Sequence, residues 1–130
     1  MHWQDAILLV AGVLGSSVAV IHGILVQRYM VGPIGDLSAI GNGMAASTLR
    51  LVRLLLHFST FAWFIGGIAL VIAAIWLQRD ARLVTCILIG ILYLFGAIGN
   101  FWGTRGRHPG WMLMASALVL IVLGANGAGV

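Results

Sequence analysis

The stretch AILLVAGVLGSSVAVIHGILVQ, residues 6–27, carries no acidic or basic side chain apart from one histidine. A helix rises 1.5 Å per residue, so about 20 apolar residues cross the ~30 Å hydrocarbon core of a bilayer. Strands of a membrane barrel are shorter and alternate in polarity. This stretch therefore predicts a transmembrane helix.

Three similar stretches follow, and the four predicted spans cover about residues 6–27, 51–78, 83–103 and 109–128. The composition agrees, because 62% of residues are hydrophobic, 8% are charged and the mean hydropathy is +1.10. So few polar residues could not cover the surface of a soluble domain. The second and third connections are short, which favours antiparallel neighbours. We predict an all-α membrane protein, a single domain over residues 1–130, with four transmembrane helices in an up-down-up-down bundle.

The first connection, residues 28–49, is predicted to be a long glycine-rich loop. Loops of this length in compact proteins are commonly functional or flexible. A short interfacial helix is expected around residues 37–46, since Ile40 and Met44 would share one face. Whether the loop lies on the membrane surface or re-enters the bilayer stays open.

All seven basic residues are arginines, and the formal net charge is +4. They lie near the predicted span ends, where they meet anionic lipid headgroups, so they do not indicate nucleic-acid binding. Five lie in or just after the first and third loops, and two lie around the second. The positive-inside rule then places these two loops in the cytoplasm and both termini outside, which we expect in a bacterial inner membrane.

Small residues recur every four positions in three spans. Lipid provides no hydrophobic drive for helix association, so such ladders permit close backbone contact within a bundle or a dimer. The predicted helix-packing residues are Ala11, Gly15, Ala19 and Gly23 in the first span, Ala62 and Gly66 in the second, and Gly99 and Gly103 in the third.

Histidines form the clearest candidate site. His22 lies inside the first span and His57 inside the second, both near the cytoplasmic side, and His108 opens the fourth span at the same side. Ionisable groups inside spans are costly and are functional candidates for that reason. Three imidazoles with one open position would suit a transition metal.

A b-type haem is the other form of this site. On a helix, four residues share a stripe with His57: Arg50, Arg53, Phe61 and Phe64. Haem iron takes axial imidazoles, and arginines and aromatic rings suit its propionates and its flat face. His22 and His57 as ligands would make an electron-transfer protein. The structural alternative is that these histidines only hydrogen-bond a carbonyl, a serine or a headgroup.

Other kinds of site are less well represented. No aspartate or glutamate lies well inside a span to relay protons. Ser16 and Ser17 lack a base and an acid for nucleophilic catalysis. Cys86 is the only cysteine, which excludes an intramolecular disulfide and a cysteine-based zinc site. We therefore do not expect an enzyme.

Three local patterns resemble a broad group of small bacterial four-helix membrane proteins of unassigned function. They are His22-Gly23 followed by Arg28 and Pro33, Arg53 followed by His57, Thr60 and Trp63, and Arg107-His108-Pro109-Gly110-Trp111. The resemblance covers three of the four predicted helices and implies that the three histidines act as a set. It implies no activity.

These observations predict an accessory or assembly protein that contacts membrane lipid and packs with itself or with a larger membrane complex. The alternatives are a haem- or metal-binding redox protein, and a small transporter or lipid binder with a polar cavity open to one side. We expect the site at the cytoplasmic end, and nearly featureless apolar packing in the opposite half.

Overall fold

The computed structural model describes residues 2–34 and 45–125 of the 130-residue chain, and this part contains helices and no strand. The helices are α1 (Trp3–Val26), α3 (Ala46–Trp76), α4 (Arg79–Thr104) and α5 (Gly110–Ala125). A π-helical turn, η1 (Gln27–Val31), continues α1, and the described helical segment extends to Ile34. The prediction of an all-helical chain is confirmed.

Three helical segments are long and apolar enough to cross a membrane, namely Trp3–Ile34, Ala46–Trp76 and Arg79–Thr104. The fourth helix, α5, is also apolar but has 16 described residues. It rises about 24 Å over that length, less than the ~30 Å of a hydrocarbon core. Three helices are thus long and apolar enough to span a membrane, and the described part of the fourth is shorter than these three.

The predicted loop over residues 28–49 is too long at both ends. The helix that begins at Trp3 continues to Ile34, and α3 already begins at Ala46. The backbone N–H of Gly32 donates to the carbonyl of Gln27, so a wide π-type turn carries the helix past residue 28. Most of the expected interfacial helix at 37–46 lies outside the described residues.

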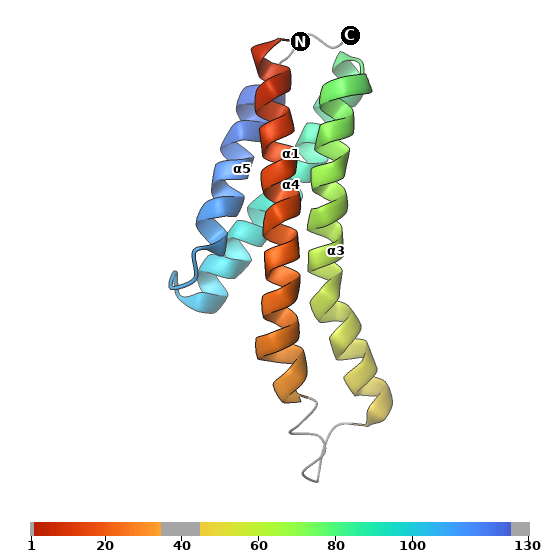
Figure 1. Ribbon diagram of the computed structural model, residues 1–130, viewed down its shortest axis with the longest axis vertical. Helices are drawn as coiled ribbons and strands as arrows, with labels where there is room; N and C mark the ends of the chain where they lie inside the picture. Colours follow the sequence, from red (N-terminus) through yellow and green to blue (C-terminus); the bar gives the residue numbers. More distant parts are fainter. Residues whose placement is uncertain (1, 35–44, 126–130) are drawn as a thin grey trace.

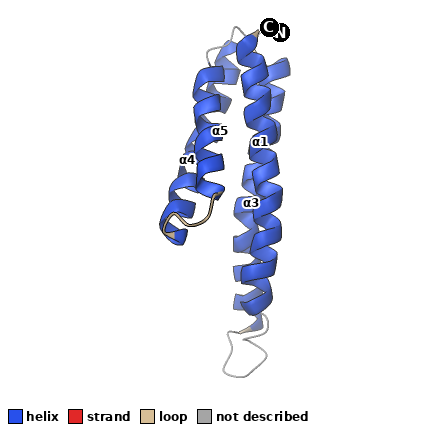
Figure 2. Ribbon diagram, turned by 60° about the vertical axis from the view of Figure 1, so that its left-hand side comes forward, coloured by secondary structure: helices blue, strands red, loops and turns tan. Residues whose placement is uncertain are grey.

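The four helices pack in a ring in which each packs mainly against two others. α1 packs against α3 and α5, and α4 packs against α3 and α5. Figures 1 and 2 show that α1 and α3 run side by side and extend well beyond the hairpin of α4 and α5.

Two glycines let the backbones of α1 and α3 touch. A Cβ on Gly67 would lie 2.5 Å from the carbonyl oxygen of Gly12, and a Cβ on Gly12 would lie 2.6 Å from that of Gly67. Neither distance is compatible with a real side chain. Close approach of this kind increases dispersion contact between helices in lipid, where the hydrophobic effect gives no help.

Tyr93 connects α4 to both helices of this pair. Its ring is fully buried, and its hydroxyl donates a hydrogen bond of 3.1 Å to the carbonyl of Trp63 on α3. A Cβ on Gly15 of α1 would lie 1.9 Å from the Tyr93 hydroxyl oxygen. The phenol therefore occupies the space that the missing side chain of Gly15 leaves.

Replacing Tyr93 with phenylalanine should lower the free energy of unfolding by about 0.5–1.5 kcal/mol. The loss stays modest because the ring still fills its space and only the hydroxyl bond disappears. The measurement is a titration of the detergent-solubilised protein with sodium dodecyl sulfate, followed by circular dichroism. Tyr29→Phe is the matched control, because Tyr29 is exposed. Equal unfolding midpoints for Tyr93→Phe and Tyr29→Phe would contradict a stabilising role for the Tyr93 hydrogen bond.

Candidate functional site

Two neighbouring cavities lie between the helices near the turn that joins α4 to α5. Their volumes are about 280 and 430 Å³. His22, Trp63 and Asn100 line both of them, so the cavities meet at these three side chains.

The walls of both cavities are mostly apolar. The smaller cavity is bounded by α1 and by the start of α5, with Val18, Ile21, Leu25, His108, Pro109, Gly110 and Leu113 completing its lining. The larger one lies between α3 and α4, where Leu55, Phe58, Leu92 and Phe95 contribute large side chains. No lining residue of either cavity is an arginine, lysine, aspartate or glutamate. A bound molecule would therefore meet hydrocarbon and a few uncharged polar groups.

Trp63 stands where α1, α3 and α4 converge. It is 5% exposed, and the imidazole of His22 packs against its ring at 4.6 Å between centroids. A Cβ on Gly96 of α4 would lie 2.8 Å from the indole. The indole thus fills the junction, and the two cavities open beside it.

Ser59 is the hydrogen-bond partner of His22, and the acceptor that the Ser59 hydroxyl uses sets the roles at Nε2 of the imidazole. Ser59 Oγ donates to the carbonyl of Leu56 at 3.3 Å and lies 3.3 Å from Nε2 of His22. A hydroxyl has one proton to give, so its oxygen accepts from Nε2–H of His22. In a neutral imidazole, Nδ1 is then left as the acceptor.

His108 has the same tautomer for a different reason. The backbone N–H of Gly110 donates to Nδ1 of His108 at 3.0 Å, so a neutral ring carries its proton on Nε2. A Cβ on Gly110 would lie 2.8 Å from that Nδ1, so glycine is required for this contact. Thr104 Oγ1 donates to the carbonyl of Asn100 and accepts from the His108 backbone N–H. The turn therefore holds His108 and Asn100 at the cavity.

The turn itself is closed by aromatic packing. Arg105 and Gly106 both have positive φ angles, of 51° and 73°. The indole N–H of Trp111 donates to the Gly106 carbonyl at 3.2 Å, and its ring meets Phe101 edge-on at 5.2 Å. The segment from Arg107 to Trp111 that the sequence singled out is thus part of a well-bonded turn.

The structure does not support the predicted haem site between His22 and His57. Nε2 of His57 is bonded to Gln27 at 3.0 Å, whereas His22 is bonded to Ser59, and His57 lines neither cavity. The four other predicted haem contacts are exposed side chains, namely Arg50, Arg53, Phe61 and Phe64. Their stripe lies about 120° around α3 from Trp63, so it faces away from the cavities.

The predicted metal site at His22, His57 and His108 is not formed. Among residues 2–34 and 45–125, no group of three or more His, Cys, Asp or Glu side chains lies close enough to hold a metal ion. His22 and His108 line one cavity, and the third imidazole lies elsewhere. His22 and His57 lie at a similar level of the α1–α3 pair, but they bond to different partners, Ser59 and Gln27.

The predicted helix-packing residues have different surroundings in α1, α3 and α4. Ala11, Gly15 and Ala19 are buried, Gly23 lies against Thr60, Ala62 is half-buried, and Gly66 is buried against α4. In contrast, a Cβ on Gly99 or Gly103 would meet nothing within 4 Å among the described residues. These two glycines line the larger cavity instead.

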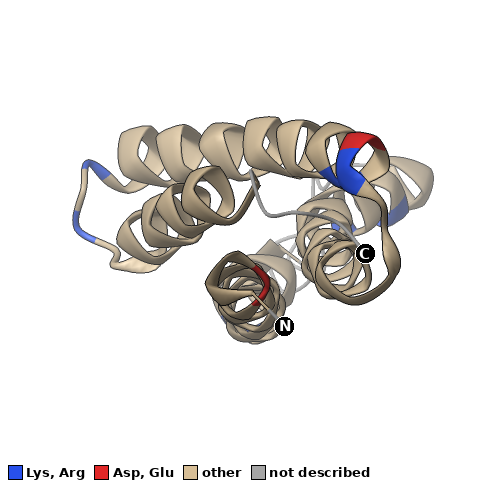
Figure 3. Ribbon diagram, turned by 90° about the horizontal axis from the view of Figure 1, so that it is seen from above, with Lys and Arg blue, Asp and Glu red and all other residues tan. Residues whose placement is uncertain are grey.

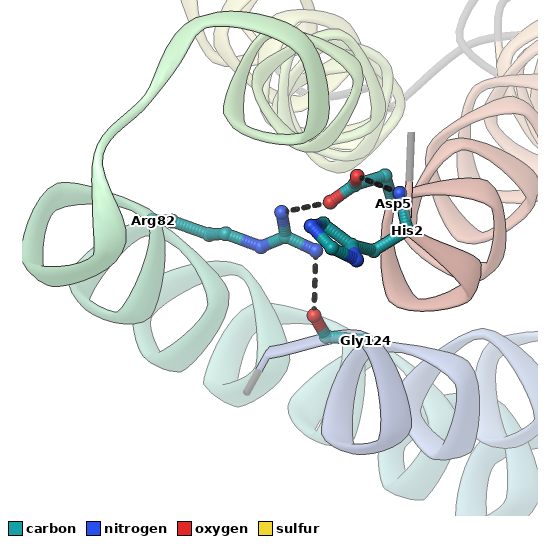
Figure 4. Close-up of polar contacts among 4 residues, drawn as sticks. All are labelled: His2, Asp5, Arg82 and Gly124. Carbon is teal, nitrogen blue, oxygen red and sulfur yellow. Dashed lines mark hydrogen bonds and ion pairs between the residues drawn. The ribbon is translucent and has the colours of Figure 1, made fainter. Parts of the chain in front are cut away.

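A buried ion pair at the opposite end of the molecule was not predicted. Arg82 is 1% exposed, and its guanidinium binds the carboxylate of Asp5 and, at 2.8 Å, the carbonyl of Gly124 (Figure 4). The backbone N–H of His2 donates to the same carboxylate at 2.7 Å. These contacts connect α1, α4 and α5, so the expectation of featureless apolar packing in this half is wrong. The sequence held one indication of this pair, because Asp5 and Arg82 both lie within the first turn of their helices.

No known protein family, curated protein or solved structure matches the chain. The resemblance of the three histidine-containing patterns to small bacterial membrane proteins stays a prediction. The candidate site is therefore defined by its own geometry alone.

Proposed function

We propose that this chain is a four-helix integral membrane protein that binds a membrane lipid in the two cavities beside Trp63. The observation that carries the proposal is the pair of connected apolar cavities that share His22, Trp63 and Asn100. Pockets for small molecules commonly have volumes of about 300–1,000 Å³ and a few well-placed polar groups on apolar walls. The two cavities together fall in that range and have that character.

The exposed residues around the larger cavity support a lipid as its occupant. Leu54, Leu55, Phe58, Phe95 and Ile98 are all exposed, and they belong to the two helices that bound the cavity. Exposed side chains of this kind face hydrocarbon in a membrane protein. An acyl or isoprenoid chain can therefore enter the cavity from the bilayer without crossing water.

The charges support a bundle that runs up, down, up and down with both termini outside the cytoplasm. Arg82 is neutralised by Asp5, and Asp80 offsets Arg79, so the α3–α4 end has no excess positive charge. The other end includes the basic turn between α4 and α5 (Figure 3). The positive-inside rule assigns that end to the cytoplasm. A bacterial inner membrane is the proposed location, in line with the resemblance described above.

Photolabelling tests the proposal. The protein is reconstituted in vesicles of phosphatidylethanolamine and phosphatidylglycerol with a trace of diacylglycerol that carries a diazirine in one acyl chain. We expect labelling that excess unlabelled diacylglycerol displaces, with the modified peptides mapping to α3 and α4 beside the larger cavity. In Gly99→Leu/Gly103→Leu, labelling should fall severalfold, because the two side chains would occupy the cavity.

The double variant should remain folded, because both glycines have open space in front of them. Ala81→Leu is the matched control, since Ala81 is an exposed residue of α4 that lines neither cavity. Labelling that cannot be displaced, or that survives the two leucines unchanged, would show that the cavities do not hold lipid.

An accessory subunit that packs with a second copy or a larger membrane complex is the second candidate function. It is favoured by Gly99 and Gly103, which interrupt an exposed face of large side chains on α4. Small residues on a lipid-facing surface allow another helix to approach closely. A wild-type protein that is monomeric in mild detergent and co-purifies with no partner would rule this candidate out.

A further inference from the structure

We infer that the head of the bound lipid is an uncharged hydroxyl group, held between His22 and His108. The inference rests on the proposed lipid binding and adds the chemistry of the ligand head. Both histidines line the smaller cavity, and Asn100 lies beside them. These are the polar side chains among its ten lining residues, apart from the indole of Trp63.

The absence of charge around the cavities excludes a phosphate head. Neither cavity is lined by an arginine or lysine. A phosphate taken from water into an apolar site without a cation would lose its hydration and gain no charged partner. The arginines at the end of the molecule near the cavities are exposed, and none of them lines either cavity. Phospholipids are therefore expected to surround the protein, and a neutral lipid to occupy the cavity.

The tautomers of the two histidines make their roles complementary. His108 uses Nδ1 as the acceptor for Gly110 and retains a free Nε2–H donor. His22 uses Nε2–H as the donor to Ser59 and retains a free Nδ1 acceptor. One cavity is therefore lined by one unused donor and one unused acceptor.

A hydroxyl group satisfies both of these partners at once. It donates its proton to Nδ1 of His22 and accepts from Nε2–H of His108. An ester or ketone oxygen would satisfy only His108, and a methyl ether cannot donate to His22. The same head chemistry occurs on acyl glycerols, on isoprenoid alcohols and on prenylated hydroquinones. The geometry of the polar groups points to this class and the test distinguishes its members.

Competition for the photolabelled site tests the inference in the full-length protein in the same vesicles. The competitors are diacylglycerol, a polyprenol and a prenylated hydroquinone, each paired with its O-methyl ether, and phosphatidic acid. At least one hydroxyl form should displace the label at about fivefold lower concentration than its ether, because the ether lacks the one hydrogen bond to Nδ1 of His22, worth ~1 kcal/mol. The alcohol that competes at the lowest concentration identifies the hydrocarbon chain of the bound lipid.

Three histidine variants locate the effect. His22→Phe should make the hydroxyl and ether forms compete equally, because the Nδ1 acceptor is lost, whereas both forms accept from Nε2–H of His108. His108→Gln should retain the preference, because its amide N–H reaches the position of Nε2–H. His57→Phe is the matched control, since His57 lines neither cavity, and it should behave like the wild type.

The outcomes separate the two proposals. Equal competition by every hydroxyl form and its ether in the wild type would overturn the hydroxyl assignment while the lipid site stands. Stronger competition by phosphatidic acid than by any alcohol would overturn it as well. A label that no lipid displaces would overturn the lipid site and the head assignment together.

Discussion

Arg82→Met is expected to destabilise the protein by about 3–5 kcal/mol, because it leaves the carboxylate of Asp5 buried without its partner. Asp5 is 8% exposed, and Arg82 provides its only charged contact in the described part of the chain. The change also removes the donor to the Gly124 carbonyl. Titration with sodium dodecyl sulfate followed by circular dichroism measures the loss as an earlier midpoint.

The double variant Asp5→Leu/Arg82→Met should recover most of that stability. Buried ion pairs are costly to desolvate, so apolar replacement of both partners is often neutral or stabilising. Arg79→Met is the matched control, because Arg79 lies on the same helix but is exposed. A loss for Arg82→Met no larger than that for Arg79→Met would contradict the role of the pair.

Gly67→Ala should have the second large effect, a loss of about 1–3 kcal/mol or more for one added methyl group. The new Cβ would lie 2.2 Å from Ser16 Oγ and 2.5 Å from the carbonyl oxygen of Gly12. The second obstacle is backbone, so α1 and α3 must move apart and lose dispersion contact along their length. The same detergent titration measures the change.

Gly12→Ala should cost a similar amount, and the two changes should not add. Once one methyl group has separated the helices, the second meets less resistance, so the double variant should lose less than the sum. Gly99→Ala is the control, since a Cβ there meets no described atom within 4 Å. Equal stability of Gly67→Ala and Gly99→Ala would show that the helices are not in backbone contact at this point.

Gly99 and Gly103 show what residue spacing alone cannot predict. Gly99 and Gly103 have the same four-residue spacing as Gly15 and Ala19, yet they line a cavity while the pair on α1 is buried. Spacing defines a face of a helix and leaves open what lies opposite that face. The neighbour depends on how α4 crosses the bundle, which no local pattern encodes.

The histidines show the same limit. Their depth could be predicted, because it follows from counting residues along a span at 1.5 Å each. Their grouping could not, because His57 lies about 120° around α3 from Trp63 and bonds to Gln27. His22 and His108 meet at one cavity only because α1 and α5 are in contact.

The sequence by itself determined the helical class and identified segments that are long and apolar enough to cross a membrane. These follow from the cost of placing charge and unpaired backbone groups in hydrocarbon, which acts on each segment separately. Only the tertiary structure decided which glycines allow helices to touch, that Arg82 binds Asp5 rather than headgroups, and which histidines share a cavity. Those features depend on the angle at which helices cross, a collective result of packing all four helices together.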